Sequence, residues 1–338
     1  MTGRACVVVL NWQGRNYIRD CLRAALAQTY EDARVIVVDN ASTDGSREIV
    51  RDEFPEATLV PLPENLHFAR GTNAGVETAL RDPECAYVMT LNNDTRMEPD
   101  ALAALVAGMR DPRVGVVAAK LLFMDTGRIN SAGISPTFDG SGVDRGWMQA
   151  DEGQFDAALD VFGASAGAAV YRREALDRVG LFDGDFLAYY EDLDLAWRLR
   201  LAGWEARFAP GARVRHKYSA STSPRAIWKT YQGERNRIWN LVQNYPWRYA
   251  AVAVPWNASR VASALGRHLL RKRSPHTDSP TLSAFTSAII RARLDAYAGM
   301  PRALEKRRRR RASLWVDPRA VGRWLRTYGV RIRDMPFD

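Results

Sequence analysis

Cysteine is scarce in this chain of 338 residues, which contains only Cys6, Cys21 and Cys85. These residues stand far apart and form no Cys-x-x-Cys pair, which argues against a disulfide framework and against a zinc knuckle. Because so few cysteines suit a reducing compartment, we expect a cytoplasmic protein. The first residues, MTGRACVVVLNW, lack the long apolar segment and the small-residue cleavage site of a signal peptide, so none is predicted.

Long apolar runs and two common nucleotide-binding motifs are also absent. A membrane-spanning helix needs about 20 apolar residues, and the best candidate, YAAVAVPWNAS after Arg248, is shorter and contains a proline. No GxxxxGK[ST] follows any strand-like segment, and no GxGxxG follows the first one. The sequence therefore predicts neither a membrane-spanning protein nor a P-loop enzyme nor a dinucleotide-dependent oxidoreductase.

Charge is present but unevenly distributed. The whole chain has a formal net charge of +9, and the residues from 251 onward hold 19 Lys and Arg against 6 Asp and Glu. The first 250 residues are therefore mildly acidic, and a hydrophobic fraction of 46% is typical of a globular protein. This asymmetry indicates a basic carboxy-terminal region attached to a mildly acidic catalytic or binding body.

Strand-like and helix-like segments alternate over the first 120 residues. The strand-like runs are continuously apolar, and the segments between them repeat their apolar residues at helical spacing. Strands are predicted over 5–11, 34–40, 58–62, 86–94 and 114–122, and helices over 15–28, 42–54, 71–82 and 97–111. Ser42, Thr43 or Asp44 can cap the second helix. Such alternation predicts an α/β fold with a Rossmann-like, doubly wound and mostly parallel sheet.

The remainder of the chain is less regular. Residues 123–165 are rich in Gly, Ser and Asp and predict loops and short strands; later segments predict a strand that ends near His216, a helix over 225–245, and further helix broken at 274–280. We therefore predict an α/β domain over 1–245, with a regular half over 1–122 and a less regular half over 123–245, and a basic helical extension over 246–338.

Polar side chains follow three predicted strands, at the sheet edge where ligands bind in folds of this kind. The segment VVDNASTDGS (37–46) suits hydrogen bonding to a nucleobase or ribose, but it also suits a well-capped turn. The segment LNNDT (91–95) offers Mg²⁺ or Mn²⁺ a hard carboxylate, but it also fits an Asx turn. His216 is either a structural residue or, if it lies near Asp94, a metal ligand.

Seven segments, taken in order, resemble the family 2 glycosyltransferases of GT-A fold, and among them the bacterial rhamnosyltransferase-like branch. The segments are VVVLNWQG, VVDNASTDGS, ENLHFARGTNAG, LNNDT, RREALDRVGLFDGDFLAYYEDLDLAWRLRLAGW, the histidine of VRHKYSAS, and YQGERNR. The resemblance implies an inverting, metal-dependent sugar transfer in cell-surface polysaccharide synthesis, with a saccharide or lipid-linked saccharide as acceptor. It favours dTDP-L-rhamnose as the donor, with UDP-sugars as the alternative.

The resemblance implies that 1–245 is the catalytic domain, with a nucleotide-binding half over 1–122 and an acceptor and catalytic half over 123–245. It also implies roles for single residues. Asp192 matches the catalytic base, with Glu191 beside it, and Asp94 and His216 match the ligands of a divalent cation, Mg²⁺ or Mn²⁺. The implied donor nucleotide-binding residues are Asn11, Asp39, Ser42, Arg70, Asn73 and Asn93. Two positions depart from the family pattern. Asn92 stands where many relatives have the first acid of the DxD metal motif, and His67 stands where this branch usually has glycine.

The acidic segment YYEDLDLAWRLRLAGW (189–204) combines a candidate catalytic acid with residues that hold its helix in place. Asp194 lies one helical turn before Arg198, which predicts an ion pair. An apolar stripe is predicted to anchor the helix, and Gly203 can end it; the stripe consists of Leu193, Trp197 and Leu201. Glu191 is predicted to support the site or cap the turn, and the family resemblance assigns the chemistry to Asp192.

The basic segment EKRRRRRASLW (305–315) has three interpretations. It is a solvated helix, a nucleic-acid contact, or an attachment to an anionic membrane, which would place the enzyme peripherally at the inner face of the plasma membrane. Two rival functions for the chain remain. A nucleic-acid-binding module is disfavoured by the acidic body and by the lack of a known motif. A nucleotidyltransferase leaves the Glu191–Asp192 pair unexplained.

Overall fold

The computed structural model describes residues 3–218, 223–249, 251, 253, 282–313 and 318–330. The chain divides into two compact units. The first contains the residues up to Ser135 and Val143–Tyr218, and the second contains Pro136–Gly142 and the described residues after 218. The functional boundary predicted at residue 245 stays a prediction, and the helix break predicted at 274–280 lies outside the described residues.

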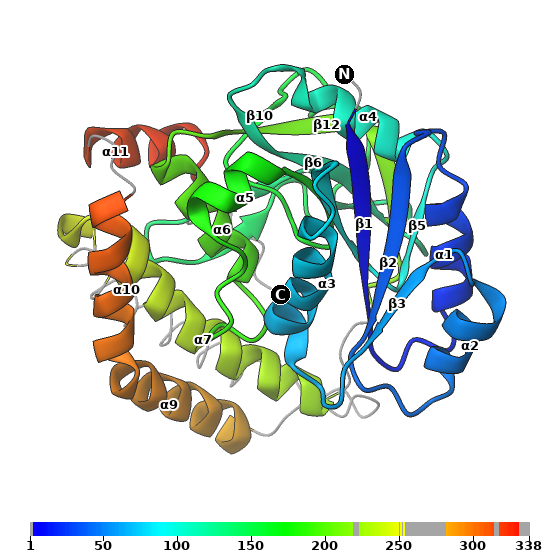
Figure 1. The fold of residues 1–338 in the computed structure, drawn as a ribbon. Coiled ribbons are helices and arrows are strands. Elements are labelled where there is room, and N and C mark those ends of the chain that lie inside the picture. Colours follow the sequence, from blue (N-terminus) through cyan, green and yellow to red (C-terminus); the bar gives the residue numbers. More distant parts are fainter. Residues whose placement is uncertain are drawn as a thin grey trace. The chain divides into compact units, whose positions relative to one another are not determined.

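A ten-stranded sheet forms the first unit (Figure 1). The order is β10-β12-β6-β11-β4-β1-β2-β3, with β5 beside β12 and β7 beside β6. The strands are β1 (Arg4–Asn11), β2 (Ala33–Asp39), β3 (Thr58–Pro61), β4 (Cys85–Asn92), β5 (Thr95–Met97), β6 (Val114–Phe123), β7 (Ile129–Ser131), β10 (Asp160–Val161), β11 (Ala168–Arg172) and β12 (Glu205–His216). Strand β11 runs antiparallel to both of its neighbours, whereas β1 to β4, β6 and β12 share one direction. The predicted mostly parallel α/β sheet is therefore confirmed; β11 and the short strands β5, β7 and β10 are antiparallel to their neighbours.

Helices cover both faces of this sheet. They are α1 (Ile18–Leu26), α2 (Ser46–Glu53), α3 (His67–Leu80), α4 (Ala101–Ala107) with a short 3₁₀ turn over Gly108–Arg110, α5 (Arg173–Val179) and α6 (Glu191–Leu201). Figure 1 shows α1 and α2 on one side of β1 and β2, with α3 on the other. The doubly wound arrangement predicted from the alternating segments is thus present.

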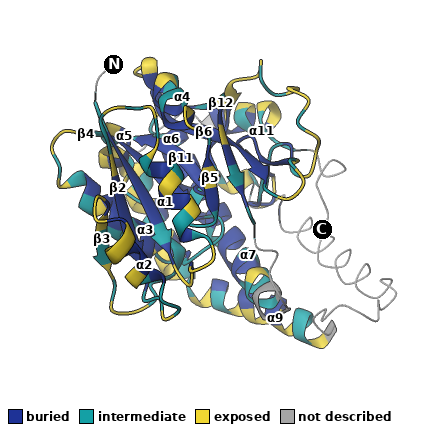
Figure 2. Cartoon of the chain, turned by 90° about the vertical axis from the view of Figure 1, so that its right-hand side faces the viewer, coloured by how far each residue is buried: buried dark blue, intermediate teal, exposed yellow. Residues whose placement is uncertain are grey.

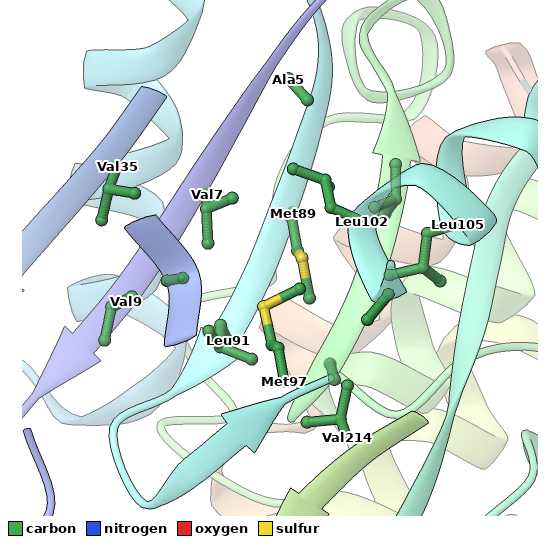
Figure 3. Close-up of a cluster of buried hydrophobic side chains, with 14 of the residues drawn as sticks. Ala5, Val7, Val9, Val35, Met89, Leu91, Met97, Leu102, Leu105 and Val214 are labelled. Carbon is green, nitrogen blue, oxygen red and sulfur yellow. The ribbon is translucent and has the colours of Figure 1, made fainter. Parts of the chain in front are cut away.

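Strand β1 shows why the sequence pattern is continuous rather than alternating. Ala5, Val7 and Val9 point into one core layer (Figure 3), and Cys6 and Val8 point into the layer on the opposite face. Successive strand residues face opposite sides, so a strand covered by helices on both faces must be apolar throughout. Burial of each such valine stabilises the fold by about 1.5–3 kcal/mol.

Helix α3 lies unusually close to the sheet. It begins at His67, four residues before the predicted start, with His67 at φ +59°. Gly75 makes the close approach possible, because a Cβ at this position would lie 2.3 Å from a methyl carbon of Val8 and 2.7 Å from one of Val38. The amino-terminal end of α3, where several predicted donor residues stand, is therefore positioned by direct contact between helix backbone and strand side chains.

The capping of α2 differs from the prediction. Its N-cap residue is Gly45, at φ +84°, rather than Ser42, Thr43 or Asp44. Asp44 instead accepts hydrogen bonds from the backbone N–H of Ser46 at 3.0 Å and from that of Arg15 at 2.8 Å. The Asp44 carboxylate thus joins the loop after β2 to the loop after β1. Gly45 suits the cap position because glycine adopts the left-handed conformation without strain.

Outside the large sheet, β8 (Ile134–Pro136) pairs with β9 (Gly142–Asp144). The second unit is helical and contains α7 (Ser223–Asn244), α9 (Leu282–Ala298), α10 (Met300–Ser313) and α11 (Pro318–Thr327). Helix α7, which confirms the predicted helix over 225–245, packs against α9 and α10. Figure 2 shows many exposed residues on α9. None of the described helices combines the length and the hydropathy that crossing a membrane requires.

The YQGERNR segment (231–237) lies in α7 and contributes to a buried polar interior of the second unit. Arg237 donates to the carbonyl of Asp139 at 3.0 Å and to the Glu234 carboxylate at 2.9 Å. At the end of α7, the Arg307 guanidinium donates to the carbonyl of Tyr245 at 2.6 Å. Buried polar groups are stable only when they are hydrogen-bonded, so these bonds give the segment a clear structural use.

Candidate active site

Four polar residues stand where strands of the same direction end. They are Asn11 of β1, Asp39 of β2, Asn92 of β4 and His216 of β12. Asn11 lies directly opposite Asp39 in the pairing of β1 with β2. In sheets of this kind the carboxyl ends of the strands carry the ligand site, so this edge is the candidate active site.

The predicted donor residues of the first two strands form one buried cluster around Asn11. Both Asn11 and Asp39 are fully buried. The Asn11 amide donates to Asp39 Oδ1 at 3.0 Å and to Ser42 Oγ at 3.3 Å, and Asn11 Oδ1 accepts from the Asn93 amide at 2.9 Å. The structure therefore brings together four of the six residues assigned to the donor nucleotide.

Arg47 is a member of this cluster that the sequence analysis missed. Its Nε donates to Asp39 Oδ2 at 2.6 Å, and the backbone N–H of Ser42 donates to the same oxygen at 3.2 Å. A carboxylate has about four acceptor positions, so after these bonds and the one from Asn11 it can accept one more. An arginine eight residues after an aspartate carries no recognisable sequence signal, because the pairing depends on the intervening turn.

Asp94 and His216 meet at the next part of the edge. Asp94 Oδ1 lies 3.1 Å from His216 Nε2. The backbone brings them together, because β12 pairs with β5 at His216 and Thr95, and the N–H of Lys217 donates to the Asp94 carbonyl at 2.9 Å. His216 therefore lies near Asp94, which is the arrangement that a role as a metal ligand requires.

The hydrogen bond made by the other imidazole nitrogen, Nδ1, bears on whether His216 and Asp94 can bind a metal ion. Nδ1 lies 2.7 Å from Asn130 Oδ1, an acceptor that requires the imidazole proton on Nδ1. In the neutral imidazole the lone pair of Nε2 then faces the Asp94 carboxylate, and these two acceptors would suit a cation between them. Over the described ranges no cluster of three or more His, Cys, Asp and Glu forms. Two ligands leave positions for phosphate and water, as Mg²⁺ prefers, so the residues fit a hard divalent cation.

Asp192 lies near the start of α6 and is partly exposed. Its carboxylate accepts hydrogen bonds from the backbone N–H of Leu193 at 2.7 Å and from that of Ala166 at 3.3 Å. Burial raises the pKa of Asp192, and these backbone donors partly offset the increase. A fixed carboxylate with a raised pKa is a suitable general base.

Glu191 lies in a less favourable environment than Asp192. It is buried, and among the described residues its Oε2 has no hydrogen-bond partner. Burial raises the pKa of Glu191 well above its ordinary value, and the charge of Asp192 raises it further. The pair therefore holds less negative charge in the folded protein than two free carboxylates would hold.

The rest of α6 anchors the pair as predicted. The ion pair from Arg198 to Asp194 is present at 2.9 Å, and both side chains are buried. Leu193 and Trp197 are fully buried, Leu201 is partly exposed, and the helix ends at Leu201 with Gly203 at φ +90°. Such an anchor limits the movement of the first turn, where Asp192 stands.

The two remaining donor residues contact the loop that precedes α6. The Asn73 amide donates to the Phe182 carbonyl at 2.8 Å, and Asn73 Oδ1 accepts from the Phe182 N–H at 3.1 Å. Arg70 donates to the Gly184 carbonyl at 3.2 Å and keeps about half of its side chain exposed. Helix α3 is therefore bonded to the loop that carries the acids, while Arg70 retains exposure for a ligand.

The same loop contains residues with left-handed backbone conformations. Leu187, Tyr189 and Tyr190 have φ values between +63° and +69°, and His67 on the facing helix start has φ +59°. Each non-glycine residue in this region costs about 1–3 kcal/mol. His67, which stands where this branch of the family usually has glycine, therefore has a backbone conformation that favours glycine.

Comparison with known families decides the class of the protein. The profile of Glycosyl transferase family 2 matches residues 6–180, more than half of the chain. The chain belongs to this family. It is therefore a glycosyltransferase, and the matched region includes the cluster around Asn11, Asp94 and helix α3.

Two curated relatives of this glycosyltransferase differ in their substrates. The N-acetylglucosaminyl-diphospho-decaprenol L-rhamnosyltransferase of Mycobacterium tuberculosis is 27% identical over 249 residues, which are 66% of this chain and 78% of that protein. The poly-beta-1,6-N-acetyl-D-glucosamine synthase of Staphylococcus aureus is 26% identical over 196 residues, which are 57% of this chain and 45% of that one.

Solved structures with the same fold include two glycosyltransferases. A mannosyltransferase from Pyrobaculum calidifontis in complex with GDP-Man and Mn²⁺ aligns with a TM-score of 0.51 at 20% identity, covering 97% of this chain and 81% of that chain. GalNAc-T7 with UDP, GalNAc and Mn²⁺ aligns with a TM-score of 0.54 at 13% identity, covering 71% of this chain and 47% of that chain. The fold of this glycosyltransferase is GT-A.

Proposed function

We propose that this glycosyltransferase moves L-rhamnose from dTDP-L-rhamnose to a hydroxyl of a lipid-linked saccharide in cell-surface polysaccharide synthesis, with inversion. The similarity to the L-rhamnosyltransferase supports the choice of donor and acceptor. The observation that carries the reaction type is the fixed, partly exposed carboxylate of Asp192, whose pKa burial raises.

In the proposed reaction Asp192 acts as general base. The acceptor oxygen forms a bond to the anomeric carbon, the bond from that carbon to the diphosphate breaks on the opposite face, and the hydroxyl proton moves to the Asp192 carboxylate. Help of this kind accelerates a reaction by about 10²–10⁴-fold. The backbone N–H groups that hold Asp192 keep its carboxylate in one orientation for the transfer.

Asp94 and His216 are proposed to hold the divalent cation, with Asn130 fixing the imidazole. Such a cation would supply Lewis-acid stabilisation of the charge on the departing diphosphate. Arg70 is bonded to the loop before α6 through the Gly184 carbonyl, and its guanidinium lies 3.7 Å from the Asp185 carboxylate. This loose pairing leaves its guanidinium able to bind phosphate oxygens.

The cluster around Asn11 is proposed to bind the nucleoside. Ser42 and Asn93, which are partly exposed, would contact the base, and the fully buried Asp39 would hold Ser42 through its backbone N–H. Because Asn73 is already bonded to Phe182 in both directions, we propose that it acts on the site through the loop rather than by contact with the donor.

A UDP-sugar is the second candidate donor. The cluster around Asn11 suits it equally, because thymine and uracil present the same ring N–H and carbonyl groups to the residues that surround them. Because the chain belongs to Glycosyl transferase family 2, it is a glycosyltransferase rather than a nucleotidyltransferase or a nucleic-acid-binding module.

Thermal stabilisation by a panel of sugar nucleotides tests the proposal, since a ligand that binds the native state raises the melting temperature. We expect dTDP-L-rhamnose to stabilise the protein more than UDP-glucose or UDP-N-acetylglucosamine, and only with Mg²⁺ or Mn²⁺ present. The Asp94→Ala variant should lose this stabilisation, whereas the exposed control Asp20→Asn should keep it. Larger stabilisation by a UDP-sugar would replace the donor, and no cation dependence would overturn the metal assignment.

A further inference from the structure

Helix α9 presents its large apolar side chains to solvent. Ile290 is 55% exposed, Leu294 63% and Tyr297 61%. Their spacing of four and three residues places them on one face of the helix. The buried positions of the same helix are mostly small; they are Ala288, Ile289, Ala292 and Ala296.

This distribution is the reverse of that expected for a helix on a protein surface. Surface helices direct a large apolar face to the core and a polar face to water. Single exposed apolar residues are common, whereas contiguous exposed apolar patches mark interaction sites, and these three side chains share one helical face. Here alanines contact the interior and the larger residues remain free for another apolar environment.

Positive charge borders the apolar face. Arg291, next to Ile290, has 81% of its side chain exposed. Helix α10 follows directly and exposes Leu304, which shares one helical face with Arg308 and Arg311 at spacings of four and seven residues.

The acids of this region are already paired. Asp295 accepts from the Tyr231 hydroxyl at 2.5 Å and lies 3.9 Å from Arg291. Glu305 pairs with Arg309. Among the described residues of α9 and α10, the exposed arginines therefore outnumber the acids, which gives these two helices a net positive charge.

We propose that the exposed faces of α9 and α10 form an interfacial surface that binds an anionic lipid membrane. The apolar face of α9 would enter the boundary between headgroups and acyl chains, and the arginines would contact the lipid phosphates. With 17 residues and this one-sided pattern, α9 lies in the plane of the membrane rather than across it.

Charge complementarity selects this partner over a second copy of the chain. Association of two copies through the same face would bring Arg291, Arg308 and Arg311 of each copy toward like charges, which disfavours the contact. An anionic membrane matches both the apolar face and the surrounding arginines. This surface extends the predicted basic segment at 305–315, which contains none of the apolar residues of α9.

The inference rests on the proposed function only for the advantage that membrane binding would give the enzyme. A lipid-linked acceptor is reached most easily by an enzyme that is held at the membrane, but membrane binding itself needs neither donor nor acceptor. The two proposals therefore fail separately: donor stabilisation is measured without vesicles, and vesicle binding is measured without donor.

Flotation of the full chain with vesicles of phosphatidylcholine and phosphatidylglycerol tests the inference. We expect binding to these vesicles at low salt and much weaker binding to phosphatidylcholine alone. Leu294→Ser/Tyr297→Ser should lower the partition coefficient by at least about tenfold. The matched control is Leu159→Ser in the first unit, where Leu159 is 43% exposed, and it should bind like the unchanged protein.

A charge variant tests the second part of the surface. Arg308→Ser/Arg311→Ser should weaken binding by roughly fivefold for each arginine and reduce its salt dependence. The exposed control Arg23→Ser should have no effect. All these side chains are at the surface, so melting curves and donor-induced stabilisation should be unchanged, which separates loss of membrane binding from loss of folding.

Three results would overturn the inference. One is equal flotation of the protein and its Leu294→Ser/Tyr297→Ser variant. Another is equal binding to neutral and anionic vesicles. The third is a self-associating protein in sedimentation velocity that becomes monomeric in the Leu294→Ser/Tyr297→Ser variant while neither form floats, because the face would then be an interface between copies.

Discussion

The candidate site has two sides of opposite character. On the donor side, the carboxylate of Asp39 and the amide of Asn11 are fully buried and extensively hydrogen-bonded. On the acid side, Glu191 is buried with an unpartnered oxygen, and burial raises the pKa of both Glu191 and Asp192. Three residues just before these acids have left-handed backbone conformations.

The difference separates binding from chemistry in physical terms. A binding surface benefits from side chains whose orientation is already fixed, because less entropy is then lost when the ligand arrives. A base benefits from an environment in which its charged form is less stable, since this raises its affinity for a proton. Strain of this kind persists only where the surrounding structure holds it, and here α3 and the remainder of α6 provide that support.

The largest effect is expected from Asp192→Asn, which should reduce sugar transfer without reducing donor binding. Without the carboxylate, transfer should fall by about 10²–10⁴-fold, because the acceptor proton has no base. The donor should still raise the melting temperature, since the nucleoside cluster is intact. Turnover assays with a saccharide acceptor, beside the exposed control Asp177→Asn, make the measurement. Near-normal turnover would contradict the role of Asp192.

Asn130→Ala tests whether the metal position is supported from behind. Removal of the oxygen that fixes His216 Nδ1 should lower the affinity for Mn²⁺ by about 10–100-fold, as is typical when such a supporting group is lost. Titration calorimetry with Mn²⁺ and the nucleoside diphosphate measures the change. The control is Asn16→Ala, an exposed residue outside the metal position, which should leave the affinity unchanged. An unchanged affinity in Asn130→Ala would remove Asn130 from the site.

Asn73→Ala sharpens the comparison by separating the two sides. If Asn73 acts through the loop before α6, kcat should fall about tenfold while the donor KM changes little, because two hydrogen bonds to Phe182 are lost. Steady-state kinetics with varied donor concentration measures both constants. A large rise in donor KM at constant kcat would instead indicate direct contact with the nucleotide.

The smallest expected effect is on stability, from Glu191→Gln. The folded-state pKa of Glu191 is raised, so its contribution to stability is greatest when it is protonated and is lost as the pH rises through that pKa. Asp192 and Asp194 face the same group and act in the same direction. The variant should therefore melt a few degrees higher than the unchanged protein at pH 8, with a smaller difference at pH 5. A constant difference would contradict the assignment.

The class of fold could be predicted because its signal is local. Continuous apolar runs such as Val7–Val9, followed by helical spacing, indicate a covered parallel sheet from the sequence alone. The antiparallel orientation of β11 could not be predicted in this way, because Ala168–Arg172 is also a short buried run and its direction depends on the chain before it.

The site could be predicted only in part for the same reason. Asp94 and Asp192 stand in segments with a recognisable pattern, whereas Arg47 and Asn130 are ordinary surface-type residues in the sequence. Their positions follow from tertiary contacts: a turn brings Arg47 to Asp39, and Asn130 of β7 lies beside His216 of β12 only in the assembled sheet. The interaction of Asn73 with Phe182, 109 residues away, belongs to the same class.

The glycine at position 75 has a consequence for how the two sides are spaced. Because α3 touches Val8 and Val38 where a side chain would otherwise lie, the missing methyl group sets the height of the helix above the sheet. His67, Arg70 and Asn73 all lie on that helix, so a larger residue at position 75 would move them, and the loop bonded to Asn73, away from Asn11 and Asp39 in the sheet. The absence of a side chain at position 75 therefore helps to set the distance between the donor side and the acid side.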